Sequence, residues 1–427
     1  MPTGARAVVR AERWLTMLLL CLSGSFMFWL PYFSDAYYVP MQRAFGFSNT
    51  QIGVLSSTFG LVSLIFYAPG GWMADRFPAR QLICTALVLS GAAGLIFATI
   101  PTFDVCLLLY AVWGLSASLI FWSALIKATR NWGDKDEQGR AYGLLEGGRS
   151  LSDAAFSAVF LALFAWQGAD PAALTNNIQM RSYCLLLLAV LVWFVMKDAP
   201  AGRPDAQVTE TAFSWSKLKV VVKMPILWLL SLVILATNWA MWGTIYFTPY
   251  ATTIYELGEV WGGAIGGGKY WLAAIAAIAA GVVADQIGTA KAVVGLFILM
   301  TASFLFFTLV PGAPGLVPLL LINASVAAIV VYALRGIYYA LLEQGNIPLA
   351  FTGTAVGMVS VIGYTPDTFA PVISGLILDT WAGALGFQVL FGLIAFLCAI
   401  GLFASMLIYR RIDASVLVGK QLVPDLD

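Results

Sequence analysis

Twelve stretches of this chain are apolar over the length of a membrane-crossing helix, and this feature limits the possible folds more than any other. A helix needs about 20 apolar residues to cross a hydrocarbon layer of roughly 30 Å. Only 11% of the 427 residues are charged, against about a quarter in soluble domains. The sequence therefore predicts an all-α integral membrane protein.

The apolar stretches fall into two sets of six. The predicted spans lie near 14–39, 50–74, 81–101, 104–129, 138–166, 181–197, 224–252, 260–284, 291–310, 315–343, 351–378 and 385–409. One substantial polar interval, residues 198–223, separates the sixth span from the seventh. We therefore expect a six-helix bundle at 1–197, a linker at 198–223 and a second six-helix bundle at 224–427.

The basic residues predict the orientation. Most of the 23 lysine and arginine residues fall on the side that holds both termini and the linker, whereas Arg43 and Arg181 fall on the other side. Cytoplasmic loops carry an excess of basic residues, so both termini and the linker are expected in the cytoplasm. No small-residue cleavage site closes the first apolar stretch, which we interpret as a retained span. The absence of eukaryotic extensions favours a multi-pass protein of the bacterial inner membrane.

Several function classes have no support. The chain contains no histidine, and its five cysteines lie in apolar runs without metal-ligand spacing. No nucleotide-binding Gly-Lys-Ser/Thr loop and no nucleophile elbow is present. A net charge of +1 without a basic stripe argues against nucleic-acid binding. We expect no enzyme activity, no cofactor and no metal.

A motif occurs twice at about half the chain length. Residues 71–80 read GWMADRFPAR, and a weaker copy, GVVADQIG, starts at Gly281 and is followed by Lys291. The spacing Gly-x-Ala-x-Gly recurs in the fifth and eleventh spans, and Asp153 recurs as Asp367. Such an echo in a hydrophobic chain predicts two similar membrane halves, an arrangement typical of secondary transporters.

The first copy of the motif resembles the signature G-x-x-x-D-R-x-G-R-R/K of the major facilitator superfamily, from which it departs at Pro78 and Ala79. The resemblance implies twelve transmembrane helices in two pseudo-symmetric bundles, alternating access, a monomer, and a cavity lined by spans one, four, seven and ten. It also implies that the two loops close the cytoplasmic side. The gating candidates are Gly71, Asp75, Arg76, Arg80 and Asp285. Anchoring by positive charge alone is the alternative interpretation, and Gly71 is expected to allow close helix approach.

The region Trp122…Lys127…Trp132…Glu137-Gln138-Gly139-Arg140 resembles the organophosphate and anion–cation carrier branches of that family. Those carriers move sugar phosphates, sugar acids and dicarboxylates. Organophosphate carriers generally hold phosphate with arginines in the first and seventh helices. Neither span has an arginine in its interior here, which argues against a sugar phosphate.

Charges inside the spans indicate where chemistry takes place, because each is costly unless it is paired or faces water. Lys269 lies near mid-membrane with no carboxylate three or four residues away. We expect it to contact substrate; a pair with Asp367 or Asp153 on another helix and a plain structural role are the alternatives. Arg149 can pair with Glu146, three residues away on the same helix face. Asp153, four residues beyond Arg149, lies on that face too. Asp153, Asp367 and the weaker candidate Asp35 are proposed proton carriers, and static packing is the alternative.

Aromatic side chains accompany these charges. Trp239 and Tyr246 lie on one face of the seventh span, as cavity walls or as plain packing, and Arg335 lies among tyrosines in the tenth. We predict a proton- or anion-coupled transporter of a small organic anion, bound by Lys269 with Arg149 or Arg335. A lipophilic-compound exporter and a non-transporting sensor are the alternatives.

Overall fold

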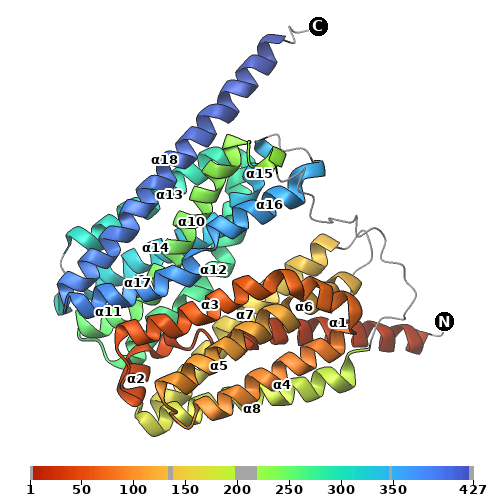
Figure 1. The fold of residues 1–427 in the computed structure, drawn as a ribbon, viewed down its shortest axis with the longest axis vertical. Helices are drawn as coiled ribbons and strands as arrows, with labels where there is room; N and C mark the ends of the chain where they lie inside the picture. The colour runs from red at the N-terminus through yellow and green to blue at the C-terminus, as the bar shows by residue number, and fades with distance from the viewer. Residues whose placement is uncertain (1–2, 133–137, 198–218, 311, 346–348, 423–427) are drawn as a thin grey trace. The chain divides into compact units, whose positions relative to one another are not determined.

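The computed structural model describes residues 3–132, 138–197, 219–310, 312–345 and 349–422, and every regular element in them is a helix (Figure 1). Most of the predicted linker therefore lies outside the described residues. Two compact units can be distinguished by their internal contacts. Unit 1 comprises Met1–Pro204, Leu257–Trp271 and Pro371–Asp379, and unit 2 comprises Asp205–Glu256, Leu272–Ala370 and Thr380–Asp427. The division into six spans plus six stays a prediction.

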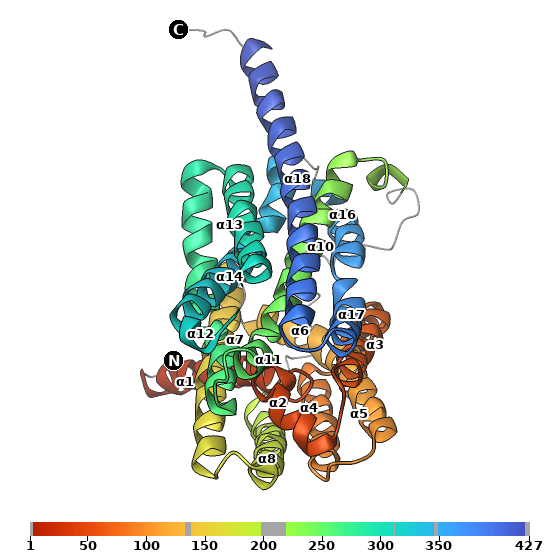
Figure 2. The same ribbon diagram turned by 90° about the vertical axis from the view of Figure 1, so that its left-hand side faces the viewer.

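The helices follow the predicted spans closely. The first six spans correspond to α1 (Thr3–Phe26) with α2 (Ser34–Phe45), α3 (Asn49–Arg76), α4 (Ala79–Phe97), α5 (Phe103–Leu115) with the π-helix Ser116–Trp122 and α6 (Ser123–Trp132), α7 (Gln138–Trp166) and α8 (Pro171–Val195). The last six correspond to α10 (Pro225–Ile245) with α11 (Phe247–Thr253), α12 (Glu259–Ile287), α13 (Thr289–Leu309), α14 (Val317–Ile337) with α15 (Leu341–Gln344), α16 (Leu349–Gly363) with α17 (Pro366–Thr380), and α18 (Ala384–Leu422). Within unit 2, α13 and α18 run side by side (Figure 2).

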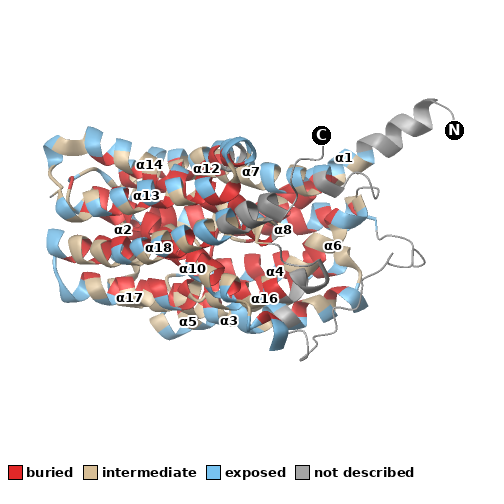
Figure 3. Ribbon diagram, turned by 90° about the horizontal axis from the view of Figure 1, so that it is seen from above, coloured by how far each residue is buried: buried red, intermediate tan, exposed pale blue. Residues whose placement is uncertain are grey.

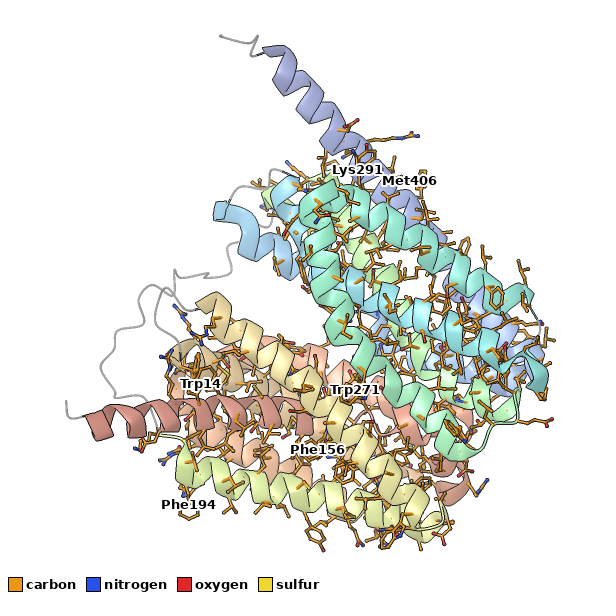
Figure 4. The ribbon with its side chains drawn as sticks, turned by 180° about the vertical axis from the view of Figure 1, so that it is seen from behind. Trp14, Phe156, Phe194, Trp271, Lys291 and Met406 are labelled. Atoms are coloured by element: carbon orange, nitrogen blue, oxygen red, sulfur yellow. The ribbon has the colours of Figure 1, made fainter. Side chains whose placement is uncertain are left out.

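Ten helical segments in the described part of the chain are long and apolar enough to cross a membrane. The two remaining predicted spans correspond to α1 and α12, which have 24 and 29 residues. Large apolar side chains cover outward surfaces, as Phe194 at the end of α8 shows with 78% exposure (Figure 4), while buried residues follow the inward helix faces (Figure 3). Lipid rather than water suits such a surface, and the chain is a multi-pass membrane protein.

Three spans are interrupted by short non-helical turns. Residues 27–33 separate α1 from α2, and Pro31 in this turn lacks the N–H that a continuous helix needs. The seventh span breaks between α10 and α11, and the eleventh breaks before Pro366. As a result, Asp35 and Asp367 each lie in the first turn of a helix, where the helix dipole favours a negative charge.

The first part of α12 packs against unit 1 through two glycines spaced four residues apart. A side chain at Gly263 would collide with the backbone oxygen of Ala36, and one at Gly267 would collide with Ser157. Small residues at this spacing let helix backbones approach closely. This close approach carries Lys269, two residues after Gly267, to the wall formed by α2 and α7.

The sixth span begins ten residues earlier than hydropathy predicts. Asp170 caps α8 by accepting a hydrogen bond from the Ala173 N–H at 2.7 Å, and Pro171 occupies the first turn. Polar residues between Thr175 and Ser182 lower the average hydropathy of this part of the helix, so the prediction misses it. The prediction that Arg181 lies outside the spans is therefore wrong: it is 5% exposed, within α8.

In this conformation the close helix contact belongs to Gly70 rather than to Gly71. A side chain at Gly71 would meet no atom within 4 Å, whereas one at its neighbour Gly70 would collide with the backbone oxygen of Ser118. The close approach of α3 to the π-helix of the fourth span thus depends on Gly70.

These adjacent glycines allow a matched test. We expect Gly70→Ala to lower the stability of the purified protein by about 1–3 kcal/mol, because a well-packed contact must open. Gly71→Ala should leave stability unchanged or raise it by up to about 1 kcal/mol, because alanine favours the helix. Thermal unfolding followed by tryptophan fluorescence measures both. Equal melting temperatures for the two variants would contradict the assignment.

Candidate functional site

A buried ion pair joins Lys269 of α12 to Asp35 of α2. Lys269 Nζ lies 2.8 Å from Asp35 Oδ2, and the two side chains are 5% and 7% exposed. The hydroxyl of Tyr270 donates a hydrogen bond to the same oxygen at 2.5 Å. Lys269 was expected to pair with Asp153 or Asp367. The ion pair that the structure shows is with Asp35 instead. The cause is the turn at 27–33, which places Asp35 within reach of α12.

A cavity of about 60 Å³ lies beside this pair inside unit 1. Its charged and polar lining residues come from helices far apart in the sequence: Asp35, Tyr37, Asp153, Ser157, Arg181 and Tyr270. Phe28, Trp29, Tyr32 and Phe33 supply aromatic walls. An anionic and a cationic group thus face one small space with an otherwise apolar border.

Asp153 bonds to the first span rather than to its own helix. It accepts hydrogen bonds from the Ser25 hydroxyl and, at 3.3 Å, from the Trp29 indole N–H. Arg149 forms the predicted pair with Glu146, 2.8 Å apart, and its guanidinium lies over the ring of Trp122 at 5.1 Å. Arg149 does not line the described cavity.

In unit 2, Arg335 and Asp367 both bond to α10. Arg335 Nη1 donates to Asn238 Oδ1 at 2.6 Å and lies 3.0 Å from the Met241 sulfur. The Trp242 indole N–H donates to Asp367 Oδ1 at 2.7 Å. The structure thus brings two predicted site residues, Arg335 and Asp367, to one segment of the seventh span.

The bond between a tryptophan and an aspartate occurs at equivalent places in the two halves of the sequence. Trp29 and Trp242 lie 213 residues apart, and Asp153 and Asp367 lie 214 residues apart. Each tryptophan donates its indole N–H to the aspartate of its own unit. The internal repeat therefore preserves a specific interaction as well as a helix pattern.

The two residues of the seventh span that were predicted to form cavity walls are buried in the helix packing. Trp239 and Tyr246 are buried, and neither lines the described cavity. The plain packing interpretation suits them in this conformation.

Of the gating candidates, Asp75, Arg76 and Asp285 are exposed, and Gly71 and Arg80 are half-buried. Asp75 and Asp285 form no ion pair with a described residue, and Arg76 lies over the Trp72 ring at 4.2 Å. Arg80 Nη1 donates to the Trp193 carbonyl at 3.4 Å. Lys127 Nζ donates to the Ala74 carbonyl at 2.6 Å, at the end of α3. A cation at a helix C-terminus is stabilising, so this loop does carry a helix-end contact.

No group of three potential metal ligands gathers anywhere in the part of the chain that the structure describes. The cysteines are free thiols.

Sequence reasoning missed Arg181, Tyr270, Ser25 and Trp29 as members of the cavity region. Arg181 had a usable signal, because Asp170-Pro171 is a typical helix start and places the arginine three turns into a helix. Ser25 and Trp29 are spaced four residues apart on one face, yet nothing local links them to Asp153.

Comparison with known proteins adds relatives that cover most of the chain. It is 31% identical to the inner membrane protein YqcE of Escherichia coli (strain K12) over 87% of this chain and 89% of that protein. It is 24% identical to the probable nitrate/nitrite transporter NarK2 of Mycobacterium tuberculosis (79% and 82% covered). It is 22% identical to the probable sulfoacetate transporter SauU of Cupriavidus necator (79% and 81% covered).

Solved structures share the fold. An inward-facing, unoccupied bacterial homologue of the human lysosomal transporter Spinster matches with a TM-score of 0.77 at 14% identity, covering 93% of this chain and 97% of that one. The sequence model of the Major Facilitator Superfamily matches residues 14–365. With these matches and its twelve-helix arrangement, the chain belongs to the major facilitator superfamily.

Proposed function

We propose that this transporter moves a small organic anion, with a carboxylate or sulfonate group, together with protons across the bacterial inner membrane. Membership of the superfamily establishes transport; the anion, the proton and the direction are the proposal. Alternating access accomplishes the movement, with Gly71, Asp75, Arg76, Arg80 and Asp285 in the cytoplasmic gate and both termini in the cytoplasm. The protein acts as a monomer within the lipid bilayer.

The buried pair of Asp35 and Lys269 carries this proposal. In the described conformation the carboxylate neutralises the ammonium group in a nearly water-free place. A proton on Asp35 removes that negative charge and leaves a buried cation, which is strongly unfavourable without a new partner. An anionic substrate supplies the partner. Proton and anion therefore bind together, and each favours the other.

Two further features support an anion. The Arg335 guanidinium, also buried within a span, has neutral hydrogen-bond acceptors, Asn238 and Met241. Asp153 and Asp367, each held by a tryptophan, are additional proton carriers near cationic groups.

The names of two relatives specify anions, nitrate/nitrite and sulfoacetate. The inner membrane assignment follows the name of YqcE.

The cavity in unit 1 is too small for a drug-sized molecule. Pockets for drug-sized ligands measure about 300–1,000 Å³, whereas the described cavity measures about 60 Å³. A carboxylate-sized group fits such a space, and a lipophilic drug does not.

Charge-removing variants test the coupling. We expect Asp35→Asn and Lys269→Gln each to destabilise the protein by about 3–5 kcal/mol, because each breaks a buried ion pair and leaves the remaining charge without that partner. The double variant should recover most of that stability, because both charges disappear together. None of the three variants, the two single substitutions and the double substitution, should show proton-driven uptake of sulfoacetate into proteoliposomes.

Exchange distinguishes coupling from folding. Asp35→Asn mimics a permanently protonated acid, so it should still exchange internal for external sulfoacetate while failing at net uptake. Lys197→Gln, which removes a surface cation paired with Glu12, serves as the control and should behave as the natural protein does. Normal proton-driven uptake by the double variant would refute the coupling role.

The substrate class can be tested by ligand-induced stabilisation. Sulfoacetate or a sugar acid such as gluconate should raise the melting temperature, because a ligand that binds the folded state stabilises it. Lys269→Ala should remove this shift, and the lipophilic cation tetraphenylphosphonium should produce none. Stabilisation by tetraphenylphosphonium alone, with Lys269→Ala unaffected, would instead indicate an exporter of lipophilic compounds.

A further inference from the structure

We infer that Arg181 is a substrate-binding residue: its guanidinium holds the carboxylate or sulfonate group of the anion in the unit 1 cavity, opposite the acids that carry the proton. The inference rests on the proposed function and adds a second cation to the one supplied by Lys269.

Arg181 is held in a fixed orientation from one side. Its Nε donates to Asn177 Oδ1 at 2.9 Å, and the Asn177 amide in turn donates to the Phe160 carbonyl at 2.8 Å. Asn177 is therefore locked by backbone on the neighbouring helix and aims the guanidinium. The guanidinium also lies within hydrogen-bonding reach of the Tyr37 hydroxyl, and both residues line the cavity.

Aromatic rings surround the rest of the group. The guanidinium carbon lies 4.6 Å from the centre of the Phe160 ring, with three further rings between 5.3 and 5.6 Å: Tyr37, Phe33 and Trp29. Ring faces attract a cation and exclude water, but they carry no net charge. The positive charge of Arg181 therefore remains uncompensated by the rings.

No carboxylate of a described residue lies within 4 Å of the Arg181 guanidinium. An arginine stays protonated in proteins, so the cavity holds a permanent positive charge. The hydroxyl of Tyr37, buried in the same wall, lies within hydrogen-bonding reach of Arg181 and Asn177. A fork of N–H donors with a hydroxyl beside it on one small space matches an oxyanion group.

The volume agrees with this ligand. A water molecule in the liquid takes about 30 Å³, so a cavity of about 60 Å³ accommodates one carboxylate- or sulfonate-sized group. The remainder of a larger anion would extend beyond the cavity as described.

The charges of the cavity link anion to proton. The titratable and charged groups around the cavity fall into two sets. Lys269 and Tyr270 contact Asp35. Arg149 and Arg181 act on Asp153, and Tyr37 lies beside Arg181. Arg149 is neutralised by Glu146. With Asp35 and Asp153 both ionised, they balance Lys269 and Arg181. One proton on either acid leaves one positive charge, which one carboxylate or sulfonate group of the anion neutralises.

Sulfoacetate binding to the purified full-length protein tests the inference, with melting temperature and equilibrium binding of radiolabelled sulfoacetate as readouts at mildly acidic and mildly alkaline pH. We expect Arg181→Gln to weaken binding tenfold or more, and Arg181→Lys to weaken it less, since lysine keeps the charge but loses the planar fork. Asp153→Asn still accepts the bond from Trp29 and should bind the anion at both pH values. Lys197→Gln should match the natural protein.

The outcomes separate the two claims. If the natural protein binds neither sulfoacetate nor nitrate nor gluconate, the proposed anion function itself is overturned. If it binds and Lys269→Gln weakens binding while Arg181→Gln does not, the proposed function stands and the role of Arg181 is overturned. Should Arg181→Gln fail to fold, undiminished binding by Arg181→Met, which also removes the charge but suits the aromatic surroundings, would overturn it equally.

Discussion

The ion pair between Asp35 and Lys269 is the interaction on which the described site depends. It brings a segment of the second half of the sequence, residues 257–271, into the compact unit formed by the first half. Two glycines of α12 make that approach possible, and a broken first span presents the acid. Buried pairs contribute little net stability, yet losing either partner is strongly destabilising. Such a pair is well suited to a step that exchanges one partner for another.

Most of the fold could be predicted from the sequence, because length and hydropathy determine membrane helices directly. Each of the twelve predicted spans corresponds to described helices. The errors lie where local chemistry opposes average hydropathy. Pro31 interrupts an apolar run, and α8 has a polar stretch from Thr175 to Ser182 after its capped start at Asp170. The second error moved Arg181 out of the membrane.

The site was predictable only in part. Intramembrane charges stand out in the sequence, so Lys269, Asp153 and Asp367 were identified, but their partners were not. A pair such as Asp35 and Lys269 joins residues from opposite halves of the chain, and helical spacing carries no information about it. The pseudo-symmetric offset did hold one recoverable clue: Trp29 and Trp242 recur at nearly the same interval as the two aspartates they bind.

The aromatic border around Arg181 has a consequence for discrimination between anions. A group that enters a small space walled by rings must shed most of its water, and the free energy of that dehydration rises steeply with the charge carried by the group. The attraction of a single guanidinium can offset the dehydration free energy of a singly charged, weakly hydrated oxyanion group. It does not offset the larger dehydration free energy of a doubly charged phosphate ester group. Selectivity in this protein would then originate in the hydration of the anion, before its shape is recognised at all.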